Sequence, residues 1–138
     1  MNILYESEVE AQGGVHGHIK SKGGAIDIDV FAPSGVRDNE HEKTNPEELF
    51  AAAYASCLDA TLHHIAEAKD IQLKEATIQA KVKAVQVEKG DLRFALDISV
   101  KLPDVSGDEA QLLLDEAYAN CPISKATDKN MDVDIKLA

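Results

Sequence analysis

The sequence has little of what several functional classes need. Of its 138 residues only two are cysteines, none is tryptophan and aromatic residues make up 4%. The formal net charge is -11 and the Lys and Arg residues are scattered, whereas a protein that binds nucleic acid needs a basic stripe. So few aromatic side chains also argue against a platform for stacking bases or sugars. We therefore expect no nucleic-acid partner.

Long apolar segments are also missing. No apolar run approaches the about 20 residues that a membrane-spanning helix requires. Residues 1–6 have neither the basic nor the apolar region of a signal peptide. We expect a cytoplasmic protein without a membrane partner, in a compartment where thiols stay reduced. The length, with 44% hydrophobic and 28% charged residues, is typical of a soluble globular protein with one domain, residues 1–138.

Turn signals and alternation predict strands near the beginning of the chain. Glycine pairs at 13–14 and 23–24 mark turns, so three short strands are expected over residues 2–10, 15–21 and 25–31. A helix is then predicted to begin with Asn45 as N-cap and Pro46 at the first position, and to end near residue 69. Alanine is frequent in this helix up to residue 57. Small side chains allow another helix to approach closely, so we expect the helix to be buried in the centre of the fold.

The second half of the chain continues the alternation of strands and helices. We expect a hairpin over residues 75–87 and 92–102, a helix over 106–120, a short helical turn after Pro122 and a last strand over 130–137. The element order is then β-β-β-α-β-β-α-β. This order indicates an α+β domain with a mixed or antiparallel sheet.

The two cysteines, Cys57 and Cys121, lie in the two least ordinary stretches of the chain. They could form a structural disulfide, be two inert core residues, or be a reactive thiol with its resolving partner. In a reducing compartment a cysteine pair is more often catalytic or redox-sensing than structural. A structural zinc site needs about four ligands at short spacings such as Cys-x-x-Cys, and the sequence has no such set, so the histidines are expected at the surface or at strand edges.

Two long motifs surround these cysteines. Asn-Pro-Glu-Glu-Leu-Phe-Ala-Ala at 45–52, followed by Tyr-Ala-Ser-Cys at 54–57, resembles the first motif of the OsmC/Ohr family of peroxide-reducing proteins. Cys-Pro-Ile-Ser-Lys-Ala-Thr at 121–127 resembles the second motif, at the family's separation of 64 residues. The resemblance covers nearly the whole chain and implies an OsmC-like fold and an intertwined homodimer.

The resemblance also implies an activity. It implies that Cys57 is the peroxidatic thiolate, that Cys121 is the resolving thiol, and that organic hydroperoxides are the substrates. The resulting disulfide would be reset by an external dithiol carried by a reductant protein, plausibly a lipoyl group. No metal, flavin or haem cofactor is implied.

A carboxylate and an arginine near the peroxidatic sulfur also belong to the family pattern. The carboxylate carries over to Glu47, but ten residues along a continuous helix span about 15 Å, with the side chains about 80° apart. We therefore expect Glu47 to reach Cys57 of the partner subunit. The arginine position of the Ohr branch, after the first glycine pair, holds Val15. Arg37 is at the OsmC-branch position, and it could supply the guanidinium or be an ordinary loop charge.

Two other functions stay open. The same fold and disulfide could serve a non-enzymatic redox sensor or binding module with weak peroxidase activity. Alternatively, both thiols could be buried and inert, in which case their pKa would lie near or above the ordinary value of about 8.5.

Overall fold

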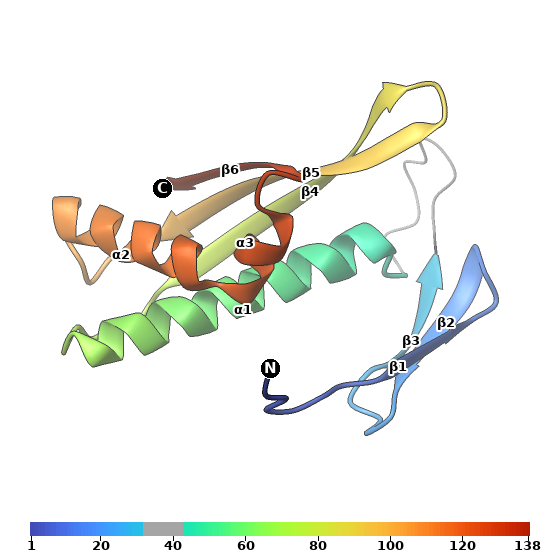
Figure 1. The fold of residues 1–138 in the computed structure, drawn as a ribbon, viewed down its shortest axis with the longest axis horizontal. Coiled ribbons are helices and arrows are strands. Elements are labelled where there is room, and N and C mark those ends of the chain that lie inside the picture. Colours follow the sequence, from blue (N-terminus) through green and yellow to red (C-terminus); the bar gives the residue numbers. More distant parts are fainter. Residues whose placement is uncertain (32–42) are drawn as a thin grey trace. The chain divides into compact units, whose positions relative to one another are not determined.

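The computed structural model describes residues 1–31 and 43–138 and shows an α+β fold (Figure 1). The predicted order of three strands, a helix, two strands, a helix and a strand is confirmed, and so is the short helical turn expected after Pro122. Internal contacts divide the chain into two compact units, Met1–Leu49 and Phe50–Ala138. A single domain over the whole chain stays a prediction. No helix in the described ranges is long and apolar enough to cross a membrane.

The first unit holds a three-stranded antiparallel sheet in the order β1-β2-β3. Its strands are β1 (Val9–Gln12), β2 (His16–Ser21) and β3 (Asp27–Phe31). The predicted turns at 13–14 and 23–24 separate them. The prediction of a first strand over residues 2–10 was wrong for residues 2–8. The ladder with β2 begins at Val9 opposite Ser21, the last residue of β2. Just before it, the Glu8 carbonyl accepts a hydrogen bond of 3.0 Å from the Lys22 N–H, in the turn that follows β2, and the strand extends no further toward residue 2.

Helix α1 (Pro46–Ala68) begins where the sequence predicts. The Asn45 side chain accepts a hydrogen bond of 2.7 Å from the Glu48 N–H, as expected of an N-cap. One side of α1 buries Tyr54, Leu58, Leu62, Ile65 and Ala66. Its alanine-rich side is more open, since Ala52, Ala53 and Ala60 are exposed in the single chain.

The second unit contains a mixed three-stranded sheet in the order β4-β5-β6. The hairpin strands β4 (Thr77–Glu88) and β5 (Asp91–Lys101) are antiparallel, and the last strand, β6 (Asp132–Leu137), is parallel to β5. Helices α2 (Gly107–Asn120) and α3 (Pro122–Thr127) connect β5 to β6. This crossover is what a parallel pair requires.

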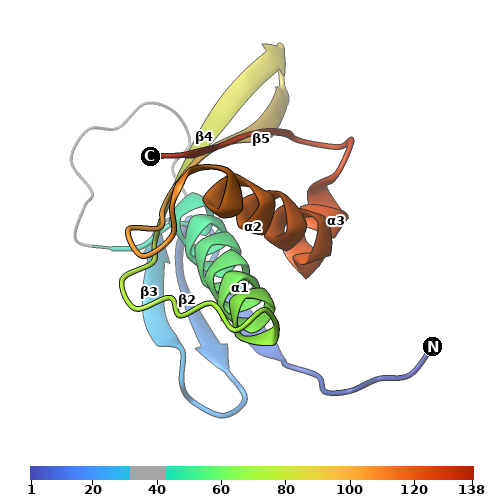
Figure 2. The same ribbon diagram turned by 90° about the vertical axis from the view of Figure 1, so that its left-hand side faces the viewer.

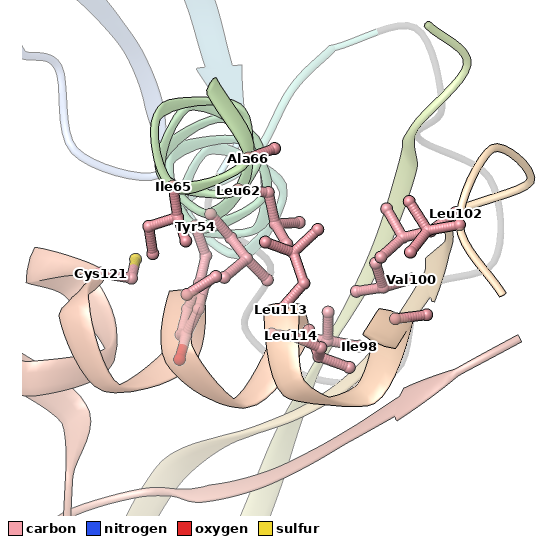
Figure 3. Packing of buried hydrophobic residues seen from close by; sticks show 14 of the residues in the cluster. Tyr54, Leu62, Ile65, Ala66, Ile98, Val100, Leu102, Leu113, Leu114 and Cys121 are labelled. Carbon is pink, nitrogen blue, oxygen red and sulfur yellow. The ribbon is translucent and has the colours of Figure 1, made fainter. Parts of the chain in front are cut away.

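Helices α1 and α2 lie side by side and share a core with the β4-β5-β6 sheet (Figure 2). Alternate residues of β5, namely Leu96, Ile98 and Val100, are buried, as their period of two predicts. Figure 3 shows Ile98 and Val100 on the same side of the cluster as leucines of α2, with the Cys121 side chain directed from the end of α2 toward α1. The core therefore includes α1, which carries Cys57, and the end of α2, which is followed by Cys121.

Candidate functional site

The structure brings the two cysteines together. Cys57 lies in the middle of α1, and Cys121 is the residue between α2 and α3. Their sulfur atoms are 3.5 Å apart, although 64 residues separate them in the sequence. Both are free thiols, and an approach of about 1.5 Å would give the ordinary disulfide length.

The two sulfurs differ in access. Cys121 is fully buried in the core, whereas Cys57 is partly exposed. Cys57 lines an open groove of about 680 Å³ with Ala60, Ile65 and Pro122 among its apolar walls. His64 also lines this groove, as its spacing of seven residues from Cys57 predicts. A molecule entering the groove can therefore meet Cys57 first.

A buried pair of hydroxyl groups stands beside Cys121. The Tyr54 hydroxyl from α1 and the Ser124 Oγ from α3 lie 2.8 Å apart, and both side chains are inaccessible to solvent. Ser124 in turn contacts the Cys121 sulfur through both its backbone N–H and its hydroxyl. The first turn of α3 therefore surrounds one sulfur with hydrogen-bond donors.

These hydrogen-bond donors make the pKa of Cys121 differ from that of Cys57. For Cys121 burial is the largest effect and acts to raise the pKa, but the Ser124 N–H and hydroxyl, aided by Cys57 and the Ile123 N–H, reverse it and lower the pKa. Burial, followed by the hydrogen bond with Cys121, raises the pKa of Cys57, against a smaller effect of the Ile123 N–H. In the single chain the thiolate therefore forms more readily at Cys121 than at Cys57.

The carboxylate expected near the site lies in α1. Because α1 is uninterrupted from Pro46 to Ala68, Glu47 and Cys57 of the same chain stand about 15 Å apart along the helix axis. The Glu47 Oε2 atom is buried and has no hydrogen-bond partner among the described residues. A buried carboxylate oxygen without a partner is costly, so this atom is a candidate for a contact with a group beyond the described residues.

Of the two arginines, Arg37 lies outside the described residues. Arg93 is exposed and its guanidinium binds Asp91 at 2.8 Å, so this arginine points to solvent. Val15 is 45% exposed in the turn between β1 and β2. The described residues thus contain no arginine beside Cys57.

The histidines form no metal centre within residues 1–31 and 43–138. His18 bridges two carboxylates of β3, with 2.6 Å to Asp27 and 2.8 Å to Asp29. His63 lies 3.2 Å from Asp59, one turn earlier in α1. These histidines are surface partners of acidic groups.

Tyr54 was not among the residues predicted for the site. Its ring packs edge-on against Phe50, which in turn lies at a tilt against Phe94. The turn after Cys121 is braced by Thr127, whose hydroxyl donates to the Ile123 carbonyl at 3.0 Å. The Tyr54–Ser124 hydrogen bond joins residues 70 positions apart, so no local pattern could indicate it.

Comparisons with known proteins identify the family. Residues 38–136 match the family model described as OsmC-like protein. The chain is 36% identical over 135 residues to organic hydroperoxide resistance protein OhrB of Bacillus subtilis, covering 97% of this chain and 98% of the relative. A crystal structure of an organic hydroperoxide resistance protein from Elizabethkingia anophelis superposes with a TM-score of 0.90 at 35% identity, covering 100% and 99% of the two chains. The crystal structure of B. subtilis OhrB superposes with a TM-score of 0.84 at 34% identity, covering 99% and 100%. The chain therefore belongs to the OsmC-like family.

Proposed function

We propose that this protein is a thiol peroxidase that reduces organic hydroperoxides to alcohols and so provides resistance to them. The observation that carries the proposal is the 3.5 Å separation between a groove-facing Cys57 and a buried Cys121. The names of relatives such as B. subtilis OhrB support organic hydroperoxides as the substrates. The partly apolar groove beside Cys57 suits the organic part of such a substrate.

In the first step the Cys57 thiolate attacks the terminal oxygen of the hydroperoxide. The O–O bond breaks, an alkoxide leaves and takes up a proton to become the alcohol, and Cys57 becomes a sulfenic acid. This step needs a thiolate at Cys57, whereas the single chain raises the pKa of that thiol. A cation beside Cys57 in the complete site would favour the thiolate.

Arg37 and Glu47 are the residues that we assign to this task. A guanidinium near Cys57 favours the thiolate, and a carboxylate can hold a guanidinium by two parallel hydrogen bonds. The uninterrupted helix α1 keeps Glu47 about 15 Å from Cys57 of its own chain. We therefore assign Glu47 to the site of a second subunit in a homodimer, where its buried Oε2 atom would gain a partner.

In the second step Cys121 resolves the sulfenic acid. Its sulfur attacks the Cys57 sulfur, the S–O bond breaks, and the oxygen leaves as water after taking up a proton. The lowered pKa of Cys121 favours the attacking thiolate. An external dithiol then reduces the disulfide, and a lipoyl group is one such reductant. The cycle needs free thiols, which fits the reducing cytoplasm.

A single-turnover experiment tests this function. Fully reduced protein is mixed with one equivalent of cumene hydroperoxide, and free thiols and intact mass are followed within seconds. We expect the loss of both thiols, a mass decrease of two hydrogens and one equivalent of cumyl alcohol. Cys57→Ser should not react, whereas Cys121→Ser should stop at the sulfenic acid. An unreactive wild-type protein over minutes would rule the peroxidase out.

The same experiment with excess dihydrolipoamide distinguishes an enzyme from a redox sensor. An enzyme yields many equivalents of alcohol per protein, whereas a sensor yields one oxidation without further turnover. The exposure of Cys57 to the groove favours the enzyme, because the substrate needs repeated access to the sulfur.

A further inference from the structure

The disulfide of the proposed cycle would join two chemically unequal sulfurs. An attacking thiol must approach a disulfide sulfur in line with the S–S bond, and the expelled sulfur must carry a negative charge. Cys121 is fully buried, while Cys57 lines the groove. The two sulfurs therefore have different roles, because they differ in access and in how well a negative charge on them is stabilised. This inference rests on the proposed function.

We propose that the reductant attacks the Cys57 sulfur, and that Cys121 leaves as a thiolate held by the Ser124 hydroxyl, which Tyr54 positions. Cys57 would thus receive both the hydroperoxide and the reductant. Cys121 would be the leaving group of the reductive step.

The exchange balances in two steps. A thiolate of the dithiol bonds to Cys57 Sγ, the Cys57–Cys121 bond breaks, and its electron pair stays on Cys121 Sγ. The second thiol of the reductant, after losing its proton, attacks the reductant's own sulfur in the mixed disulfide and expels the Cys57 thiolate. The reductant ends as a disulfide, and its two electrons have restored both cysteines.

The hydrogen bonds around Cys121 suit a leaving thiolate. Because the Ser124 hydroxyl has one hydrogen, donating it to the Cys121 sulfur leaves its oxygen to accept the hydrogen of Tyr54. Tyr54 belongs to α1 and is packed in the core, so its hydroxyl is held in place and orients Ser124. Tyr54 is therefore a positioning residue that acts on Cys121 through Ser124.

Trapping the mixed disulfide tests the direction of attack. The reduced protein is oxidised with diamide, which forms the disulfide without any peroxidase activity, and is then exposed briefly to 2-mercaptoethanol. Acid quenching, alkylation and peptide mapping locate the adduct. We expect at least about tenfold more adduct on Cys57 than on Cys121. A majority on Cys121, equal amounts, or a failure of diamide to join the two cysteines would overturn the proposal.

Variants of the two hydroxyl groups test the leaving-group role. Tyr54→Phe and Ser124→Ala should each slow the reduction of the diamide-formed disulfide by about three- to tenfold. In a Cys57→Ser background, where Cys121 is the remaining thiol, both should move the ultraviolet absorbance change of Cys121 thiolate formation to higher pH, because the thiolate loses a donor. Ser124→Thr, which keeps the hydroxyl, should restore both the rate and the pH profile.

Thr127→Val is the matched control. Thr127 is also a buried hydroxyl of α3, but it donates to the Ile123 and Ser124 carbonyls instead of supporting Cys121. We expect wild-type exchange rates and an unshifted pH profile for this variant. Unchanged pH profiles in Tyr54→Phe and Ser124→Ala, or an equal shift in Thr127→Val, would reject the positioning role. Neither result affects the proposed function, which is tested separately by the reaction of the wild type with the hydroperoxide.

Discussion

The two compact units are each built on a three-stranded sheet, but different forces hold them. In Phe50–Ala138 the sheet is covered by α1 and α2, and the core consists of fully buried leucine, isoleucine and valine side chains. In Met1–Leu49 most strand side chains are exposed, and one sheet face places Ile28 beside Ile19 while the other places His18 between two aspartates. A three-stranded sheet gains its stability from a covered apolar face. The second unit should therefore respond to lost volume, and the first to changes in its turns and charges.

The largest effect should come from the core of the second unit. Leu62 is 0% exposed, so Leu62→Ala should lower the free energy of unfolding by about 2–5 kcal/mol through lost burial and a cavity. Leu112→Ala on α2 is the matched control, since Leu112 is 69% exposed and the change should stay within about 0.5 kcal/mol. Urea denaturation measures both. Similar losses for the two leucines would show that burial does not set the stability of this unit.

The turn between β1 and β2 should be the most sensitive part of the first unit. A Cβ atom at Gly17 would lie 2.8 Å from the Gln12 carbonyl oxygen and 2.9 Å from the Gly14 carbonyl oxygen. Gly17→Ala should therefore destabilise the protein by about 1–3 kcal/mol, because the backbone must shift. At Gly23, in the turn between β2 and β3, nothing lies within 4 Å of an added Cβ, so Gly23→Ala should cost little. Unfolding followed by circular dichroism compares the two, and an equal response would refute the steric explanation.

The elements differ in how well the sequence predicts them. The start of α1 followed from Asn45 and Pro46, because a helix cap is a local pattern. In β5 the alternation holds for Leu96, Ile98 and Val100, which are buried, but not for Leu92 on the same face, which is 71% exposed. The first strand was predicted too long because strand formation needs a neighbour, and β2 ends opposite Val9. Local preference over residues 2–8 could not reveal that missing partner.

The candidate site shows the same limit. The motifs around Cys57 and Cys121 predicted that the two cysteines act together, and the structure places their sulfurs 3.5 Å apart. The difference between the sulfurs depends on how α1 packs against α3, which determines that Tyr54 meets Ser124. A tyrosine in an apolar stripe gives no sign of the group its hydroxyl will contact. Tertiary contacts of this kind lie beyond any local pattern.

A smaller effect in the second unit should appear at low pH. The Asp104 carboxylate accepts hydrogen bonds from the Lys74 N–H at 2.8 Å and the Glu75 N–H at 3.2 Å, and these bonds lower its pKa. A lowered pKa means that the stabilisation is present above the unfolded value of 3.8 and is lost as the pH falls through the folded value. The wild type should therefore exceed Asp104→Asn in stability at about pH 7, with the difference shrinking below about pH 4. Urea midpoints across this range measure it, and a difference that does not change with pH would contradict the role of the charge.

The smallest effect should come from the charge cluster of the first unit, and it should have the opposite sign with pH. Hydrogen bonds to Asp29 and then Asp27 raise the pKa of His18 above 6.5, and the bond to His18 lowers the pKa of Asp29 below 3.8. For a raised histidine pKa the stabilisation is full below 6.5 and is lost as the pH rises through the folded value. The Asp29 contribution is lost only as the pH falls through its lowered value, so the cluster is complete between those limits.

His18→Asn tests this cluster. The wild type should be more stable than the variant at about pH 5.5, and the difference should be smaller at about pH 8.5, because the imidazolium loses its proton as the pH rises through the folded value. Lys20, 3.8 Å from Asp27, is the other cation close to that carboxylate and stays charged at both pH values, so it cannot produce the change. Because His18 is exposed, the difference should be small and should shrink further at high salt. Urea midpoints at the two pH values measure it, and a difference that grows toward alkaline pH would mean that neutral His18, rather than the imidazolium, holds β2 against β3.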